Sequence, residues 1–401
     1  MTVALIYDPS VAEYRFPAGH PMQPERFTLA VSLMREWGLL EPPADSTGAP
    51  GRVPRAPVWA PSAATEDDAL LIHSADYLAA LKAADAAPED ADPAYGLGPG
   101  DTPAFRGVLA ASLLAVGGTC LALDSVLDGR ATRTFSPAGG LHHAAHDRAS
   151  GFCTLNDCAI AIERAIRARP ELRIAYVDID AHHGDGVEAA FRHRDDVLTV
   201  SLHESGRYLF PGTGAARDIG EGAGRGYAVN VALPPGAGPD EFASAFRGIV
   251  VPAVHAFAPD AIVAQLGADS HRGDPLTHLE NTIEGHARLV GGIVDLAEEV
   301  CSGRVAATGG GGYQPFSAVP RMWACAMARL MGATIPAEVP MAWLVESRAA
   351  AGGRAEMGSA ATFDDGPEYR DLELAQIATD LTRQAIEETA AASPLLSGTP
   401  S

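Results

Sequence analysis

The chain contains short continuous runs of Val, Ile, Ala and Leu, and these runs alternate with longer stretches that have helical spacing. The clearest runs are Ile174–Ile179, Val197–Leu202, Ala228–Leu233, Ala261–Leu266 and Val305–Thr308. A strand that is apolar at nearly every residue must be covered on both of its faces. Such strands, alternating with helices, therefore predict an α/β domain with a doubly wound, mostly parallel sheet.

Further elements follow from the same patterns. Three more strands bring the expected sheet to eight: Val3–Tyr7, Leu70–His73 and Thr134–Ser136. Helical spacing predicts helices at Arg26–Trp37, Ala75–Lys82, Phe105–Leu127, Asp157–Ala168, Glu188–Arg192, Asp240–Phe257, Thr282–Val300 and Pro320–Met331. Gly and Pro clusters predict long loops at Pro42–Pro61, Pro88–Pro103 and Gly206–Gly226.

Residues 1–345 are expected to form one large domain, and residues 346–401 an acidic tail. The tail divides into a linker at Ala349–Gly366, an amphipathic helix at Asp371–Thr389 and ten disordered residues at the end. The helix carries apolar residues that should dock on the body or on a partner, namely Leu372, Leu374, Ile377, Leu381 and Ile386.

Charge and cysteine content exclude several classes of protein. The chain has 29 Lys and Arg against 51 Asp and Glu, a net charge of −22, which argues against nucleic-acid binding. Its five cysteines are odd in number and form no CxxC pair, so neither a disulfide framework nor a Cys₄ zinc site is expected. The first residues have a strand pattern, not that of a signal peptide, and no uninterrupted apolar stretch reaches about 18 residues. We therefore expect a soluble, cytoplasmic protein with no membrane contact.

Acidic and imidazole side chains follow two of the buried strands, where ligands of parallel sheets bind. Asp178, Asp180 and His182 alternate after one strand, so an extended backbone would point all three to one side. Asp269 follows another strand end. Carboxylates combined with an imidazole suit a hard or borderline metal ion. A metal site is therefore predicted at this edge of the sheet.

Two adjacent histidines and a tyrosine offer the remaining chemistry. His142 and His143 follow a pair of glycines, and Asp178 and Asp185 are spare acids that could each orient one imidazole. Two such His–Asp dyads are typical of a metal-assisted hydrolase. Four consecutive glycines precede Tyr313, and this loop could hold the hydroxyl as a donor to an oxyanion.

The motifs in combination resemble the zinc-dependent histone deacetylase superfamily. They are His20–Arg26, Gly139–Ala144, Gly151–Cys153, Asp178–Gly186, Phe210–Gly214 and Gly310–Tyr313. The resemblance spans about Ala4 to Leu344 and is strongest to the bacterial acetoin-utilisation (AcuC-type) deacetylases, through Asp269–Arg272 and Gly312–Gln314. It implies the arginase–deacetylase fold and makes residues 1–345 the deacetylase catalytic domain.

The resemblance also implies a role for each site residue. Zn²⁺ would be bound by Asp180, His182 and Asp269, although Fe²⁺ or Co²⁺ would also suit this set. His143 would be the general base and then the acid, backed by Asp185; His142, backed by Asp178, would give electrostatic support; and Tyr313 would polarise the acetyl carbonyl. Substrate would contact Asp101 at the rim and the tunnel residues Gly151, Phe152, Phe210 and Leu276. Arg26 would sit at an exit channel for acetate. A structural K⁺ would use Asp178, Asp180, His182, Ser201 and Leu202.

The implied reaction is removal of acetyl or longer acyl groups from acetyl-lysine in proteins, acetyl-CoA synthetase being one candidate substrate. Leu141 and Gln314 depart from eukaryotic members, and neither residue has a core role.

Three alternatives stay open. A small acetylated amine would be the substrate of an acetylpolyamine amidohydrolase, which the charge of −22 would suit. An arginase-like binuclear manganese enzyme would need further acids where Gly184 and His271 stand. An inactive binding module would have lost a ligand, the general base or Tyr313, and all of them are present.

Overall fold

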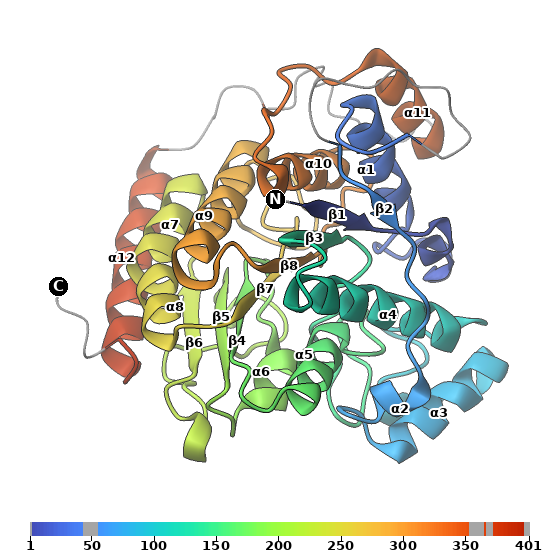
Figure 1. Ribbon diagram of the computed structural model, residues 1–401, viewed down its shortest axis with the longest axis horizontal. Helices are drawn as coiled ribbons and strands as arrows, with labels where there is room; N and C mark the ends of the chain where they lie inside the picture. The colour runs from blue at the N-terminus through green and yellow to red at the C-terminus, as the bar shows by residue number, and fades with distance from the viewer. Residues whose placement is uncertain (1, 43–54, 353–364, 366–371, 397–401) are drawn as a thin grey trace.

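Eight parallel strands form the sheet of the computed structural model, which describes residues 2–42, 55–352, 365 and 372–396. Their order is β2-β1-β3-β8-β7-β4-β5-β6 (Figure 1). The strands are β1 (Val3–Ile6), β2 (Val58–Trp59), β3 (Arg133–Ser136), β4 (Ile174–Asp178), β5 (Val197–Glu204), β6 (Ala228–Leu233), β7 (Ala261–Gln265) and β8 (Val305–Thr308). The predicted α/β class with one eight-stranded sheet is confirmed.

Helices cover both faces of the sheet (Figure 1). One layer contains α2 (Glu66–Ala69), α3 (Ala75–Ala86), α4 (Val108–Leu127), α5 (Asp157–Ala168) and α6 (Asp185–Phe191). The other contains α1 (Glu25–Glu36), α7 (Pro239–Ala245), α8 (Val251–Phe257), α9 (Ile283–Cys301), α10 (Ala318–Met331) and α11 (Met341–Ala351).

Alternate residues of each central strand face opposite helical layers. In β4, Tyr176 packs with the α4–α5 layer, whereas Val177 packs with the α9–α10 layer. This period of two explains why the central strands are apolar throughout. Helix α4 is long and apolar enough to cross a membrane, but 72% of its apolar window is buried inside the fold, as in a core helix.

The prediction of a strand at Leu70–His73 is wrong. The segment follows α2, whose first turn is closed by a capping box between Thr65 and Asp68. The eighth strand is instead β2, which lies inside the predicted loop Pro42–Pro61 and pairs with β1 at the edge of the sheet. Its two residues are half-buried and are too few to show any periodicity.

The predicted helix Asp240–Phe257 is divided into three parts. A π-helical turn at Phe246–Val250 separates α7 from α8, and Pro252 stands in the first turn of α8. Proline has no N–H to donate to the preceding turn, so the hydrogen-bond register changes there. Helix α11 was not predicted, and the expected loop Pro88–Pro103 contains two short 3₁₀ turns, at Pro88–Asp90 and Pro93–Tyr95.

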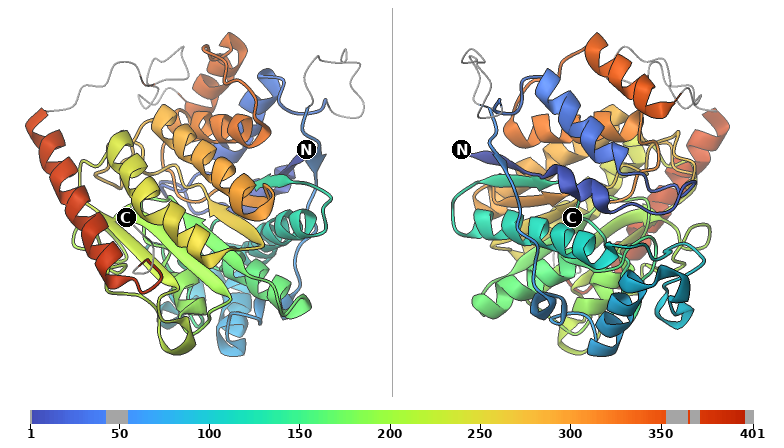
Figure 2. Two further views of the ribbon diagram at one scale, coloured as in Figure 1. Left: turned by 60° about the vertical axis from the view of Figure 1, so that its left-hand side comes forward. Right: turned by 90° about the vertical axis from the view of Figure 1, so that its right-hand side faces the viewer.

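Helix α12 (Leu372–Ala392) packs along β6 and α7, so the predicted docking on the body is confirmed (Figures 1 and 2). The buried face is made of small residues, namely Ala378, Thr382, Ala385 and Thr389. Of the apolar residues expected to dock, Ile386 packs against the core, Leu374, Ile377 and Leu381 are exposed, and the side chain of Leu372 lies outside the described residues. Most of the predicted linker and the last five residues also lie outside them.

Candidate active site

A pocket opens at the carboxyl ends of β3, β4 and β8. Its lining residues are Met22, Gly140, Leu141, His142, His143, Gly151, Phe152, Cys153, Asp180, Gly310, Gly311 and Tyr313. They come from five separate segments of the chain, and the parallel sheet brings those segments to one edge.

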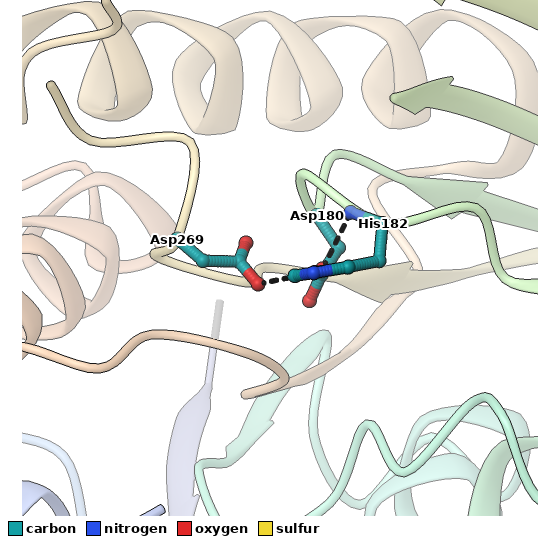
Figure 3. A group of neighbouring side chains, drawn as sticks. All are labelled: Asp180, His182 and Asp269. Carbon is teal, nitrogen blue, oxygen red and sulfur yellow. Dashed lines mark hydrogen bonds and ion pairs between the residues drawn. The ribbon is translucent and has the colours of Figure 1, made fainter. Parts of the chain in front are cut away.

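Asp180, His182 and Asp269 form a buried group beside the pocket (Figure 3). One ligand atom from each lies within 4.8 Å of the others, and the imidazole points between the two carboxylates. Their backbone and neighbours hold them: Asp180 accepts hydrogen bonds from the Gln265 side chain and Gly311 N, both at 2.7 Å. Asp269 accepts from the backbone N–H of Ala181 at 2.8 Å.

The group fits a divalent metal ion. Burial, with the carboxylate of Asp180 close by, raises the pKa of Asp269 to about 6, so a cation between the two carboxylates would relieve an unfavourable charge arrangement. Two glycines make room for them: a Cβ on Gly267 would lie 2.0 Å from the Asp180 carboxylate, and one on Gly311 1.9 Å from that of Asp269. An Asp₂His set suits Zn²⁺ and also tolerates Fe²⁺ or Co²⁺.

Asp178 does not join this group, contrary to the simple alternation predicted for Asp178, Asp180 and His182. Strand β4 ends at Asp178, so the backbone beyond it is no longer extended. The Asp178 carboxylate instead turns to His142 and also accepts a hydrogen bond from the Tyr176 hydroxyl at 2.8 Å.

Two His–Asp pairs lie next to the metal group, as the sequence predicted. His142 Nδ1 lies 2.8 Å from Asp178, and His143 Nδ1 lies 2.7 Å from Asp185. The Nε2 atoms of the two imidazoles are 3.0 Å apart. His142, Asp178 and His143 are buried and Asp185 is half-buried, so the His142–Asp178 contact is shielded from water more completely than the His143–Asp185 contact.

The surroundings give the two imidazoles opposite protonation preferences. Burial alone would lower the pKa of His142, but Asp178 and Asp180 raise it to about 9. Burial and the neighbouring charge of His142 lower the pKa of His143 to about 4, in spite of Asp185. At neutral pH the arrangement therefore favours a cationic His142 beside a neutral His143, which is the form that accepts a proton.

Tyr313 follows the run of glycines, of which Gly310 and Gly312 adopt left-handed φ values of +146° and +131°. Its ring packs edge-on against Phe152 at 5.5 Å and against His182 at 6.4 Å. Burial, together with the charges of Asp269 and Asp180, raises the pKa of the Tyr313 hydroxyl well above its usual value. The hydroxyl therefore stays protonated and can donate a hydrogen bond next to the metal group.

Of the predicted tunnel residues, Gly151 and Phe152 line the pocket, whereas Phe210 and Leu276 are not among its lining residues. Gly151 and Phe152 both have positive φ, +54° and +67°. The segment is held in that conformation because Gly151 N donates to Asp101, Phe152 N donates to Thr102, and the Tyr14 hydroxyl donates to Phe152 O. The rim carboxylate of Asp101 thus has a structural partner in the tunnel wall.

The remaining predicted site residues lie at different distances from the two His–Asp pairs. The Phe210 ring packs edge-on against His143 at 5.0 Å, and Leu276 is half-buried in the loop after β7. Arg26 is fully buried behind the glycine run, where it donates to Gly310 O at 2.8 Å and Gly312 O at 3.2 Å. Ser201 pairs in register with Asp178 on adjacent strands, and Leu202 is the next residue of β5. Of the residues expected to bind K⁺, Asp178 and Ser201 therefore lie side by side on adjacent strands.

A model of the histone deacetylase domain matches residues 20–330, which is most of the chain. The chain belongs to the histone deacetylase family. Two curated relatives carry the name acetoin utilization protein AcuC. The one from Bacillus subtilis is 39% identical over 343 residues, 85% of each chain, and the one from Staphylococcus xylosus is 34% identical over 348 residues, 86% of this chain and 87% of the relative.

Solved structures agree with this family membership. A crystal structure of a histone deacetylase homologue from Aquifex aeolicus matches with a TM-score of 0.80 at 30% identity, covering 96% of this chain and all of the other. A homologue complexed with SAHA matches with a TM-score of 0.81 at 30% identity and the same coverage. This deacetylase is therefore an AcuC-like hydrolase of a metal-dependent family, and the predicted family and fold are confirmed.

Several residues of this deacetylase's site escaped the sequence analysis. Gln265 donates to the metal-group residue Asp180, and Asp157 accepts from Gly140 N at 2.9 Å and Leu141 N at 2.7 Å, which holds the loop before the histidines. Asp274 accepts from Tyr313 N at 2.8 Å. One signal was available: Gln265 is a polar residue ending an otherwise apolar strand.

Proposed function

We propose that this protein is a zinc-dependent lysine deacetylase that removes acetyl groups from acetyl-lysine side chains in proteins. The observation that carries the proposal is the arrangement of two His–Asp pairs and the Tyr313 side chain beside one metal-ligand group, around a single pocket. Hydrolysis of an amide needs these parts: a base for water, a donor for the oxyanion and a proton for the leaving amine.

In the proposed reaction, Asp180, His182 and Asp269 would hold the metal ion, which would supply Lewis-acid polarisation of the acyl carbonyl and of the attacking water. His143 Nε2 takes the proton of that water and later delivers it to the leaving amine. Asp185 keeps the other ring nitrogen protonated and fixes the orientation of the ring. The cationic His142 and the Tyr313 hydroxyl stabilise the negative charge that develops on the acyl oxygen.

The shape of the entrance supports a long, narrow substrate. Gly151 has no room for a side chain, because a Cβ there would lie 2.4 Å from His143 and 2.9 Å from Phe210. An extended acyl-amine passes such a constriction more easily than a branched group does. On the grounds of the sequence, we also propose a cytoplasmic location and a K⁺ site formed by Asp178, Asp180, His182, Ser201 and Leu202.

The substrate class is tested by comparing two amides with the purified, zinc-reconstituted enzyme. We expect higher kcat/KM for an acetyl-lysyl peptide than for acetylspermidine, and a His143→Ala variant should be inactive on both. Faster turnover of acetylspermidine would instead identify an acetylpolyamine amidohydrolase. Reconstitution with Fe²⁺ and Co²⁺ in parallel identifies the metal that gives the highest kcat.

The number of metal ions bound per chain distinguishes the proposed deacetylase from an arginase-like binuclear enzyme. Among the described residues, one group alone has metal-ligand geometry. Gly184 supplies no side-chain ligand, and His271 Nε2 lies 2.9 Å from Asp365. We expect one divalent transition-metal ion per chain by elemental analysis, and two would contradict the proposed mechanism.

A further inference from the structure

Asp274 joins two loops that carry proposed reaction groups. Its side chain is nearly buried, at 8% exposure, in the loop between β7 and α9. One carboxylate oxygen accepts from Tyr313 N at 2.8 Å, and the other accepts from Leu276 N at 3.0 Å. The same carboxylate therefore contacts the backbone of the proposed oxyanion donor and of a proposed tunnel residue.

Tyr313 needs an anchor of this kind because of the glycines that precede it. Glycine has no Cβ to restrict its backbone, and Gly310 and Gly312 adopt φ values that other residues avoid. The run itself therefore sets the direction of the next residue only weakly. Contacts from outside hold the run: Arg26 donates to Gly310 O and Gly312 O, Gly311 bonds to Asp180 and Ala268, and Asp274 accepts from the N–H of Tyr313 itself.

A second hydrogen bond joins the same two loops, from Gln314, the residue after Tyr313. The Gln314 side chain donates to Gly273 O, the residue before Asp274. Gln314 is one of the positions where the sequence departs from the eukaryotic pattern, and no role was expected for it. Both hydrogen bonds, from Tyr313 N and from the Gln314 side chain, are accepted within Gly273–Leu276. This turn and the Tyr313 segment are therefore held together as one unit.

We propose that Asp274 is a positioning residue that sets the Tyr313 hydroxyl relative to the metal group and couples it to the tunnel wall at Leu276. The inference rests on the proposed role of Tyr313 and extends it. The side chain suits this position because its two oxygens accept from both N–H groups at once. An amide of the same shape would place an NH₂ against one of them, which costs a hydrogen bond and displaces the loop.

The test is a double-mutant cycle of Asp274→Asn with Tyr313→Phe, using kcat on an acetyl-lysyl peptide. Asp274→Asn alone should lower kcat by about 10-fold or more, because a shift of the donor weakens oxyanion stabilisation. In the Tyr313→Phe background the same change should cost less than about 2-fold, since its effect acts through the missing hydroxyl. Zinc content should be unchanged in all four proteins.

Two further variants keep the result interpretable. Gln314→Met removes the hydrogen bond from Gln314 to Gly273 O and should lower kcat by a smaller factor than Asp274→Asn. This variant tests the proposal if Asp274→Asn does not fold. Asp260→Asn is the matched control, because Asp260 also accepts a backbone N–H, that of Arg173 at 2.9 Å, at the opposite end of the sheet. It should leave kcat unchanged.

Equal kcat losses from Asp274→Asn in both backgrounds would overturn the proposal, because they would show a general structural effect. Loss of zinc in Asp274→Asn would also overturn it, by pointing to the Asp269 segment. If Tyr313→Phe itself leaves kcat unchanged, the proposed function of Tyr313 fails instead, so the two failures are distinguished.

Discussion

At the scale of single residues, the site separates two chemically identical side chains by their surroundings. His142 lies against Asp178 and near Asp180, whereas His143 faces Asp185 and the positive charge of His142. Neighbouring charges in a buried site shift a pKa strongly, so adjacent imidazoles acquire different protonation states. The division into a cationic and a neutral partner follows from contacts with acids distant in the sequence.

Tyr313→Phe tests the residue-scale mechanism. Removing the hydroxyl should lower kcat by about 10²–10³-fold, the usual cost of one oxyanion donor. KM should change much less, because the ring that packs on Phe152 and His182 is retained. Steady-state kinetics on an acetyl-lysyl peptide measure both constants. An unchanged kcat would show that Tyr313 does not stabilise the transition state.

At the scale of elements, α12 shows that an apolar stripe need not be the buried one. The helix presents small residues to β6 and α7, where a close approach is possible, and Thr389 donates to Asn230 O at 2.6 Å across that contact. Ile377 and Leu381 lie on the other side, 54% and 45% exposed. The hydrophobic pattern therefore predicted the helix and its docking correctly, but not the docked face.

Two substitutions at neighbouring positions of α12 test this orientation. Ala378 is 1% exposed, so Ala378→Glu should bury an unpaired charge and lower the free energy of unfolding by about 2–3 kcal/mol. Ile377→Glu places the same side chain on the exposed face and should change stability by less than about 0.5 kcal/mol. Urea unfolding compares the two, and equal losses would contradict the packing described for α12.

At the scale of the whole molecule, the fold keeps several imidazoles neutral and out of water. His286 in α9 is fully buried, and its ring faces the backbone of Leu266 and Gly267. Burial lowers its pKa from 6.5 to about 4. Burial also lowers the pKa of His73 to about 4. These groups make stability depend on pH.

The free energy of unfolding should fall at acidic pH, because the unfolded chain takes up protons that the folded protein does not. Below about pH 6.5 the unfolded chain protonates His286, whereas the folded protein does not until about pH 4. The contribution is therefore fully present above pH 6.5 and is lost as the pH falls toward 4, by up to ~3 kcal/mol. Urea unfolding at pH 7 and pH 5 should show a smaller decrease for His286→Leu than for the parent chain. The matched control is the same substitution at an exposed histidine, His193→Leu.

The elements that could be predicted from the sequence are the ones that are most fully buried. The central strands and α5 were predicted to within a few residues, because full burial and regular spacing leave a clear pattern, and Asn156 caps α5. Strand β2 and helix α11 were missed, since two half-buried residues or a weakly amphipathic helix give little signal. Asp180, His182 and Asp269 could be proposed as neighbours because parallel strands end at one edge.

The sequence by itself determined the α/β class, the strand-end acids and histidines, and the family to which they belong, because these depend on local spacing and composition. Only the tertiary structure decided how the surroundings of His142 and His143 give them opposite protonation preferences, which face of α12 is buried, and that Asp274 holds Tyr313 and Leu276 together. Each of these depends on contacts between segments far apart in the chain. Such contacts are set by how the loops pack above the sheet, and the order of residues within any one segment does not record them.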